Sequence, residues 1–193
     1  MKKKEINILV LVDYNVDFTE PNGKLFVDDA DNDVKRLDQW LFGNHFNFDK
    51  IIVVLDHHPS DHCSFDINGG KWTSHCVIGT KGSLLNDKLQ WLLSQKNVTQ
   101  VIKGVCRDIE EYGAVALVVD IEPMNFEEDI CNVYIAGEAL DFCVLTTYES
   151  IIYEWESDIR DSDIDLLSGV PWPRNTKVTI IEDFCSPIDK NFD

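Results

Sequence analysis

Short runs of apolar and β-branched residues recur along the chain. Five of them are long enough to form strands, at residues 6–12, 51–55, 98–102, 133–136 and 178–181. Apolar side chains fill both alternating sets of positions in these runs, so each predicted strand is buried on both faces.

Three stretches between these runs carry apolar residues at helical spacing. The first spans residues 34–42, with Asp31 or Asp33 as its candidate N-cap. The second contains the five leucines between residues 84 and 93, and the third spans 142–152. Strands that alternate with helices predict an α/β fold, a three-layer α-β-α sandwich around a mainly parallel sheet.

Length and charge narrow the class of protein. A chain of 193 residues is long enough for one domain with a sizeable core, so we expect a single domain over 1–193. The formal net charge of −18 argues against nucleic acid and anionic membranes as partners, because both would be repelled. The oligomeric state stays open.

The six cysteines and the absence of long apolar stretches bear on location. No stretch approaches the ~20 apolar residues of a transmembrane helix. The apolar run after the lysines at 2–4 is too short for a signal peptide and ends at Asp13. We therefore expect reduced thiols and a cytoplasmic protein.

Polar residues stand where the predicted strands end. The first strand ends at Asp13, the second at Asp56 and His58, and the third at Lys103. A turn of small residues after the fourth strand leads into a helix with Cys143 in its first turn. Ligands of open parallel sheets bind beyond the carboxyl ends of the strands, so this set predicts a site there.

These residue types are suited to acyl transfer. A cysteine at a helix N-terminus is a candidate nucleophile, and the helix dipole and Lys103 are expected to lower its pKa. Asp13 could accept the thiol proton and return it to a leaving group. The backbone N–H groups of Ala139 and Cys143 form a candidate oxyanion hole. The alternative for Cys143 is an ordinary buried cysteine.

Four of the five histidines lie in one stretch of nineteen residues that begins just after the second predicted strand: His57, His58, His62 and His75. Asp56 and His58 stand two apart at the end of that strand, so both side chains point to the same side. A carboxylate beside imidazoles is a typical ligand set for a divalent transition metal. The alternative is a group of surface histidines in a polar loop.

The motifs together resemble the nicotinamidase branch of the isochorismatase-like cysteine hydrolases, over residues 6 to about 155. The resemblance rests on these segments: Leu11–Asp13 with Asp17-Phe18, Asp56–Pro59 with His62, Trp72–Val77, Lys103-Gly104 with Tyr112, and Gly137–Val144. It implies the isochorismatase-like hydrolase fold. Residues from about 155 to 193 diverge from the family.

The resemblance assigns roles to individual residues. It makes Cys143 the nucleophile, Asp13 the general acid/base and Lys103 the positioning cation, with Ala139 and Cys143 in the oxyanion hole. It also implies a cis peptide bond between Glu138 and Ala139.

The same resemblance implies a metal and an aromatic pocket. Asp56, His58 and His75 would hold one divalent ion, with His62 either a fourth ligand or a residue behind the ligands. Zn²⁺ is favoured, and Fe²⁺ and Mn²⁺ also suit an N/O ligand set. The expected pocket walls are aromatic: Phe18, Trp72 and Tyr112.

The implied reaction is the hydrolysis of nicotinamide, or a similar pyridine carboxamide, to the acid and ammonia through a cysteine thioester. Two departures leave alternatives open. Asn15 stands where the family has Gln, and Glu138 replaces an aliphatic residue. The alternatives are an amidase of the same superfamily acting on another small amide, and a catalytically silent metal-binding homologue with a regulatory role.

Overall fold

The computed structural model describes residues 4–113, 129–156 and 175–192. Five parallel strands form one sheet in the order β3-β2-β1-β4-β5. Their bounds are β1 Glu5–Val12, β2 Lys50–Asp56, β3 Val98–Lys103, β4 Ile130–Gly137 and β5 Asn175–Ile180. All five predicted strands are confirmed, and so is the parallel α/β class.

The centre of the sheet supplies most of the core. Every residue of β2 from Ile51 to Asp56 is buried, and every residue of β1 from Ile8 to Val12 is buried. The β3 and β5 strands, which flank the others in the described sheet, are more exposed. Continuous apolar runs therefore mark the strands that are covered on both faces.

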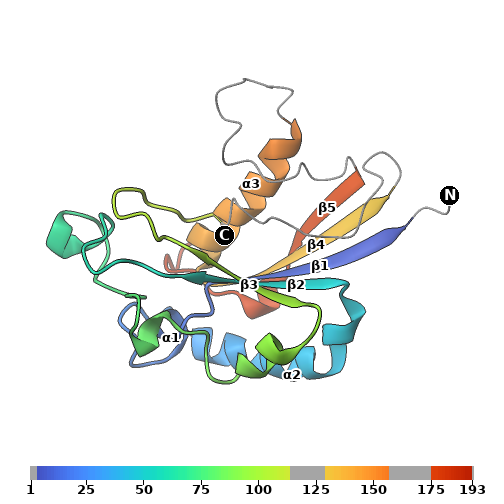
Figure 1. Ribbon diagram of the computed structural model, residues 1–193, viewed down its shortest axis with the longest axis horizontal. Coiled ribbons are helices and arrows are strands. Elements are labelled where there is room, and N and C mark those ends of the chain that lie inside the picture. The colour runs from blue at the N-terminus through green and yellow to red at the C-terminus, as the bar shows by residue number, and fades with distance from the viewer. Residues whose placement is uncertain (1–3, 114–128, 157–174, 193) are drawn as a thin grey trace.

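Helices cover the two faces of this sheet. Figure 1 shows α2 (Ala30–Asn44) on one side and α3 (Leu145–Glu156) on the other. A short π-helix, η5 (Leu140–Val144), leads directly into α3. The layers are those of the predicted sandwich.

The predicted N-cap of the first helix is wrong. Asp29, in a left-handed conformation with φ of 73°, precedes the first helical residue and makes no capping hydrogen bond with its side chain. Asp31 and Asp33 lie in the first turn instead. Asp33 is buried and bonds Arg36 and Ser186, so tertiary contacts claim the side chain that the pattern assigned to a cap.

The helix predicted over the leucines at 84–93 is also wrong. The segment contains only the 3₁₀ helix η4 (Gln90–Ser94), and Leu85 forms a β-bridge with Asn15. The amide of Asn86 donates to the carbonyl oxygen of Tyr14 at 2.9 Å, and that of Val16 to Leu84 at 2.8 Å. These long-range bonds use the backbone groups that a helix would need.

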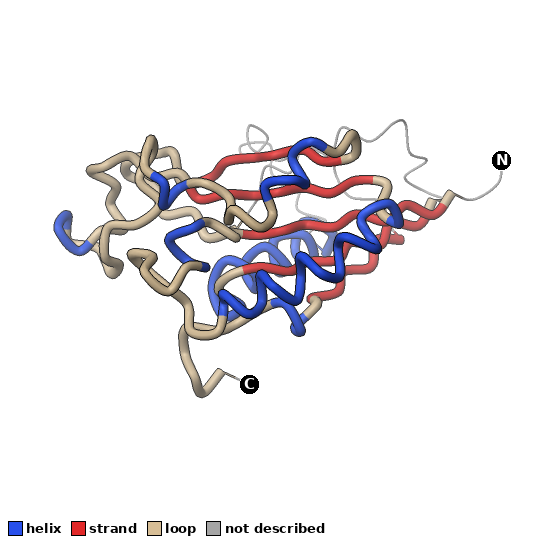
Figure 2. Tube along the Cα trace, turned by 90° about the horizontal axis from the view of Figure 1, so that it is seen from below, coloured by secondary structure: helices blue, strands red, loops and turns tan. Residues whose placement is uncertain are grey.

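The remaining elements are short and lie in the connections. They are α1 (Val16–Thr19), η1 (His45–Asn47), η2 (Asp66–Asn68), η3 (Lys81–Ser83) and η6 (Glu182–Phe184). Figures 1 and 2 show long loops gathered at the end of the sheet away from the N-terminus, beyond the carboxyl ends of the strands.

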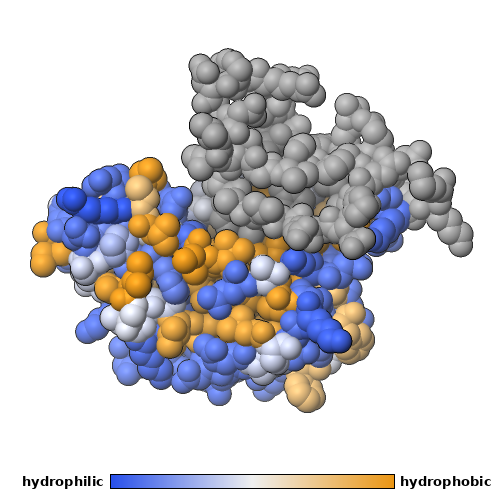
Figure 3. Space-filling model, in the orientation of Figure 1, coloured by the Kyte–Doolittle hydropathy of each residue, from blue (hydrophilic) through white to orange (hydrophobic). Residues whose placement is uncertain are grey.

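Apolar side chains also reach the surface beside this sheet. Figure 3 shows them gathered on the face where β3 lies in Figure 1, and Ile102, Val105 and Ile109 are 48%, 49% and 55% exposed. Within the described residues, none of the helices combines the length and apolar character needed to cross a membrane. Of the divergent part predicted after residue 155, residues 157–174 and 193 lie outside the described residues.

Candidate active site

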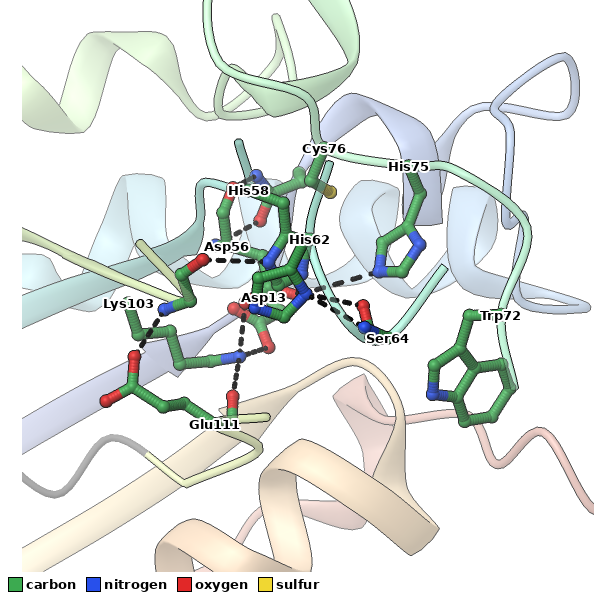
Figure 4. Close-up of polar contacts among 12 residues, drawn as sticks. Asp13, Asp56, His58, His62, Ser64, Trp72, His75, Cys76, Lys103 and Glu111 are labelled. Carbon is green, nitrogen blue, oxygen red and sulfur yellow. Dashed lines mark hydrogen bonds and ion pairs between the residues drawn. The ribbon is translucent and has the colours of Figure 1, made fainter. Parts of the chain in front are cut away.

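The parallel register brings three charged residues together at the carboxyl ends of β1, β2 and β3. Asp56 pairs with Lys103 in the ladder, and Asp13 follows β1 directly. The Nζ atom of Lys103 lies 2.6 Å from Oδ1 of Asp56 and 2.8 Å from Oδ2 of Asp13. Figure 4 shows the ammonium group held between the two carboxylates.

Burial and charge act in opposite directions on the ionisation of this cluster. Burial favours the neutral form of Asp56, but Lys103 and His58 overcome it and hold the pKa of Asp56 below its usual range. At Asp13 burial outweighs the attraction of Lys103 and, with the repulsion from Asp56, raises the pKa to about 7. Asp13 can therefore accept or release a proton near neutral pH.

Cys143 lies against the same lysine. Its Sγ is 3.6 Å from Nζ of Lys103, and its residue is only 7% exposed. Burial raises the pKa of the Cys143 thiol well above its ordinary value, although Lys103 opposes the rise. The expectation of a lowered thiol pKa is therefore wrong, because desolvation exceeds the effect of the cation. The thiol needs a base to lose its proton.

The turn before Cys143 is fixed to the neighbouring strand. The amide of Glu138 donates to the carbonyl oxygen of Val12 at 3.0 Å, and the Glu138–Ala139 peptide bond is cis, as the resemblance implies. The carbonyl oxygen of Ala139 accepts hydrogen bonds from the amides of Phe142 and Val144. Ala139 thereby sits at the base of η5, beside the thiol.

Three side chains at this end of the sheet form a candidate metal centre. Asp56, His58 and His75 are buried, and one ligand atom from each lies within 4.8 Å of the other two. Nδ1 of His58 lies 2.9 Å from the carbonyl oxygen of Gly104, and Nδ1 of His75 lies 2.7 Å from that of Thr73. A carbonyl oxygen can only accept, so each Nδ1–H donates, and Nε2 is the ring nitrogen left to bind a metal. The donor set therefore fits a divalent ion.

His62 stands behind this group. Its Nδ1 accepts from Ser64, 2.7 Å from Oγ, and its Nε2–H donates to the carbonyl oxygen of Ile109 at 3.0 Å. Both ring nitrogens are thus engaged, and the His62 ring packs on that of His58 with 4.1 Å between their centroids. This arrangement supports the second alternative for His62, a residue behind the ligands.

Asn15 fixes the backbone from which the metal group projects. Its Nδ2 donates to the carbonyl oxygens of Asp56 and Ser83, both at 2.9 Å, and its Oδ1 accepts from the amide of Asp56 at 3.1 Å. Asn15 is fully buried. The departure from the family residue at this position therefore leaves a side chain that orients the Asp56 strand end.

A pocket borders both the cysteine and the metal group. Among its lining residues are Cys143, Ala139, Asp56 and His75, together with the three predicted aromatic walls, Phe18, Trp72 and Tyr112. Nε1 of Trp72 donates to the hydroxyl of Tyr112 at 3.0 Å, which fixes both rings. A flat ring placed between these walls has the thiol and the metal group within the same pocket.

Five lining residues escaped the sequence reasoning: Leu25, Val27, Glu110, Phe142 and Ile188. Phe142 adjoins Cys143, and its ring packs edge-on against Trp72 with 5.1 Å between centroids. The sequence places Phe142 in the predicted helix over 142–152 and in the Gly137–Val144 motif, but neither marks it as a pocket wall. Ile188 lies in the part of the chain that diverges from the family, where no motif marks it.

Comparison with known proteins supports the fold and identifies the family. No protein-family model matches the chain. It is 33% identical over 168 residues to the nicotinamidase of Acinetobacter baylyi, covering 76% of this chain and 75% of that protein. The structure of yeast nicotinamidase superposes with a TM-score of 0.69 at 25% identity, covering 96% of this chain and 90% of that one.

An archaeal structure extends the likeness in fold. The pyrazinamidase of Pyrococcus horikoshii, solved in complex with zinc, has a TM-score of 0.69 at 22% identity, covering 95% of this chain and 88% of that one. The parallel α/β fold and the likeness to these nicotinamidases identify the chain as an amidohydrolase. More narrowly, the chain belongs to the nicotinamidase family.

Proposed function

We propose that this protein hydrolyses nicotinamide to nicotinate and ammonia through a thioester on Cys143, with a divalent metal held by Asp56, His58 and His75. The pocket carries the proposal, because one aromatic-walled space is lined by both the cysteine and the metal group. Membership of the nicotinamidase family supports the substrate.

The first half of the reaction transfers the acyl group to sulfur. Asp13 takes the proton of the Cys143 thiol, and the sulfur attacks the amide carbon to form a C–S bond. The N–H groups of Ala139 and Cys143 hold the oxyanion. Asp13 returns the proton to the amide nitrogen, the C–N bond breaks, and ammonia leaves.

The second half releases the acid. Asp13 accepts a proton from water as the water attacks the thioester carbon. The C–S bond then breaks, and the same proton returns to the sulfur of Cys143. Lys103 stays charged throughout, because the neighbouring carboxylates raise its pKa despite its burial. It keeps Asp13 and the thiol in reach of each other.

The metal group has a separate role in this proposal. A divalent ion held there would bind the ring nitrogen of the substrate and so orient the carboxamide toward Cys143. His58 and His75 direct their Nε2 atoms toward Asp56, 3.0 Å and 3.8 Å from its Oδ2. Zn²⁺, Fe²⁺ and Mn²⁺ all suit this donor set, and metal analysis of the purified protein identifies the ion.

The test is release of ammonia and nicotinate from nicotinamide by the purified protein. We expect Cys143→Ala to abolish turnover, because Cys143 is the only cysteine among the described residues that line the pocket. Cys106→Ala is the matched control, since Cys106 is exposed, and it should keep full activity. Lack of turnover by the unaltered, metal-loaded protein would refute the proposal, and a panel of other small amides would then test the nearest alternative.

A further inference from the structure

The segment at residues 186–190, here called the C-terminal segment, forms part of the pocket although it lies beyond every motif of the family. Ile188 lines the pocket and is 37% exposed, so its side chain stands at the mouth. We propose that Ile188 is a specificity-determining residue, whose side chain limits the ring substituents that the pocket admits. This inference rests on the proposed function.

One end of the C-terminal segment is tied to the turn that precedes Cys143. Ser186 forms a β-bridge with Glu138, and its amide lies 3.2 Å from Oε2 of that residue. The carbonyl oxygen of Ser186 accepts from the amide of Leu140 at 2.9 Å, and its Oγ lies 2.5 Å from Oδ2 of Asp33. The segment therefore keeps a fixed relation to the oxyanion turn.

The middle of the segment is held by Asp141. The carboxylate of Asp141 accepts from the amide of Ile188 at 2.8 Å and from the amide of Asp189 at 2.9 Å. Asp141 stands two residues before Cys143, in the same π-helix. Because both amides bind one carboxylate, the position of the Ile188 side chain is set relative to the nucleophile rather than left to a free end of the chain.

The far end of the segment lies near another lining residue, Val27. Nζ of Lys190 lies 2.5 Å from Oδ2 of Asp28, which follows the lining residue Val27. This ion pair is exposed, so it adds little stability. It places the far end of the segment beside Asp28, next to the lining residue Val27.

An isoleucine in this place selects by size. Its side chain has no polar group with which to recognise a substituent, so it can only contact or exclude one. A single methylene in an apolar pocket commonly changes substrate discrimination by about 10-fold or more. Shortening Ile188 should therefore admit rings that carry an additional methyl group, while nicotinamide itself keeps its other contacts.

The test compares kcat/KM for nicotinamide with kcat/KM for nicotinamides that carry one methyl group on a ring carbon. For Ile188→Ala we expect the ratio of methylated to unmethylated substrate to rise by about 10-fold for at least one methyl position. Ile188→Val should give a smaller rise. The matched control is Ile67→Ala, since Ile67 is 78% exposed in η2 and does not line the pocket.

The outcomes separate this inference from the proposed function. If the unaltered protein hydrolyses nicotinamide and every ratio for Ile188→Ala stays within about 2-fold, only the inference is overturned. If the unaltered protein does not hydrolyse nicotinamide, calorimetry gives the ratio of the affinities for methylated and unmethylated pyridine carboxylates, which needs no turnover. An unchanged ratio there also overturns the inference, and a ratio that rises supports it.

Discussion

Two buried acidic clusters meet at the turn that carries Cys143, and they differ in the placement of their cation. In the first, Asp13 and Asp56 enclose Lys103, whose side chain is only 6% exposed. In the second, Asp33 and Glu138 are fully buried, and the neighbouring Arg36 is 47% exposed and paired to Asp33. The clusters contain the same kind of acid in different surroundings.

The difference appears in where the protons lie. In the first cluster Asp56 keeps a lowered pKa, and that of Asp13 is about 7. In the second, burial and the charge of Asp33 raise the pKa of Glu138 well above its usual range. Burial also raises the pKa of Asp33, although Ser186 and Arg36 oppose it. In the first cluster the buried cation leaves one group, Asp13, ready for proton transfer. In the second, the pKa values of both acids are raised, and their contacts are structural.

The largest expected effect comes from removing the cation of the first cluster. We expect Lys103→Met to lower kcat/KM by about 10³-fold or more, because proton transfer and thiol positioning both depend on Lys103. The unpaired buried carboxylates should also cost about 3–5 kcal/mol in the free energy of unfolding. Steady-state kinetics and urea unfolding measure the two losses.

The control for that substitution is Lys81→Met. Lys81 pairs with Asp87 at 3.2 Å, but their side chains are 66% and 68% exposed. A pair of this kind contributes less than about 1 kcal/mol. Equal losses in the two variants would show that burial of the cation does not distinguish Lys103.

A second prediction concerns which cluster binds metal. His75→Ala should weaken metal binding by more than about 100-fold, since the loss of an outer partner of a ligand alone costs about 10- to 100-fold. Asp33→Asn, in the second cluster, and His45→Ala, in η1, should leave it unchanged. Mass-spectrometric metal content and competition with a chelator measure this. Full metal content in His75→Ala would exclude the proposed ligand set.

The smallest effect is a pH dependence of stability from Glu138. The folded state keeps the Glu138 proton above pH ~4.5, where the unfolded chain releases it, so the folded state binds more protons. Its stability therefore falls as pH rises above that value. Glu138→Gln removes this contribution, and its stability relative to the unaltered protein should increase with pH.

Urea unfolding between pH 5 and 8 checks this sign. The groups that face Glu138 are Asp33, Arg36, Tyr14 and Cys185, and all are retained in the variant. Glu182→Gln, an exposed glutamate in η6, serves as the control and should follow the unaltered protein. Parallel curves for Glu138→Gln and the control would show that Glu138 carries no proton of its own.

The sequence predicted the first cluster far better than the second. Asp13, Asp56 and Lys103 each end an apolar strand, and parallel strands bring such ends to one edge of the sheet. Asp33 and Ser186 are 153 residues apart, and no local pattern joins them. Contacts between residues far apart in the sequence also explain the wrong helix at the leucines of 84–93, where hydrogen bonds to the Tyr14–Val16 segment take its place. They explain why Ile188 was missed as well, because its place in the pocket depends on bonds to Asp141.

The placement of Ile188 also has a consequence during protein synthesis. The pocket is lined by residues as far apart in the sequence as Phe18 and Ile188. A nascent chain can form β1 and β2 early, but the pocket lacks its Ile188 wall until that residue has left the ribosome. The pocket is therefore assembled in stages during synthesis, after the two strands that carry Asp13 and Asp56.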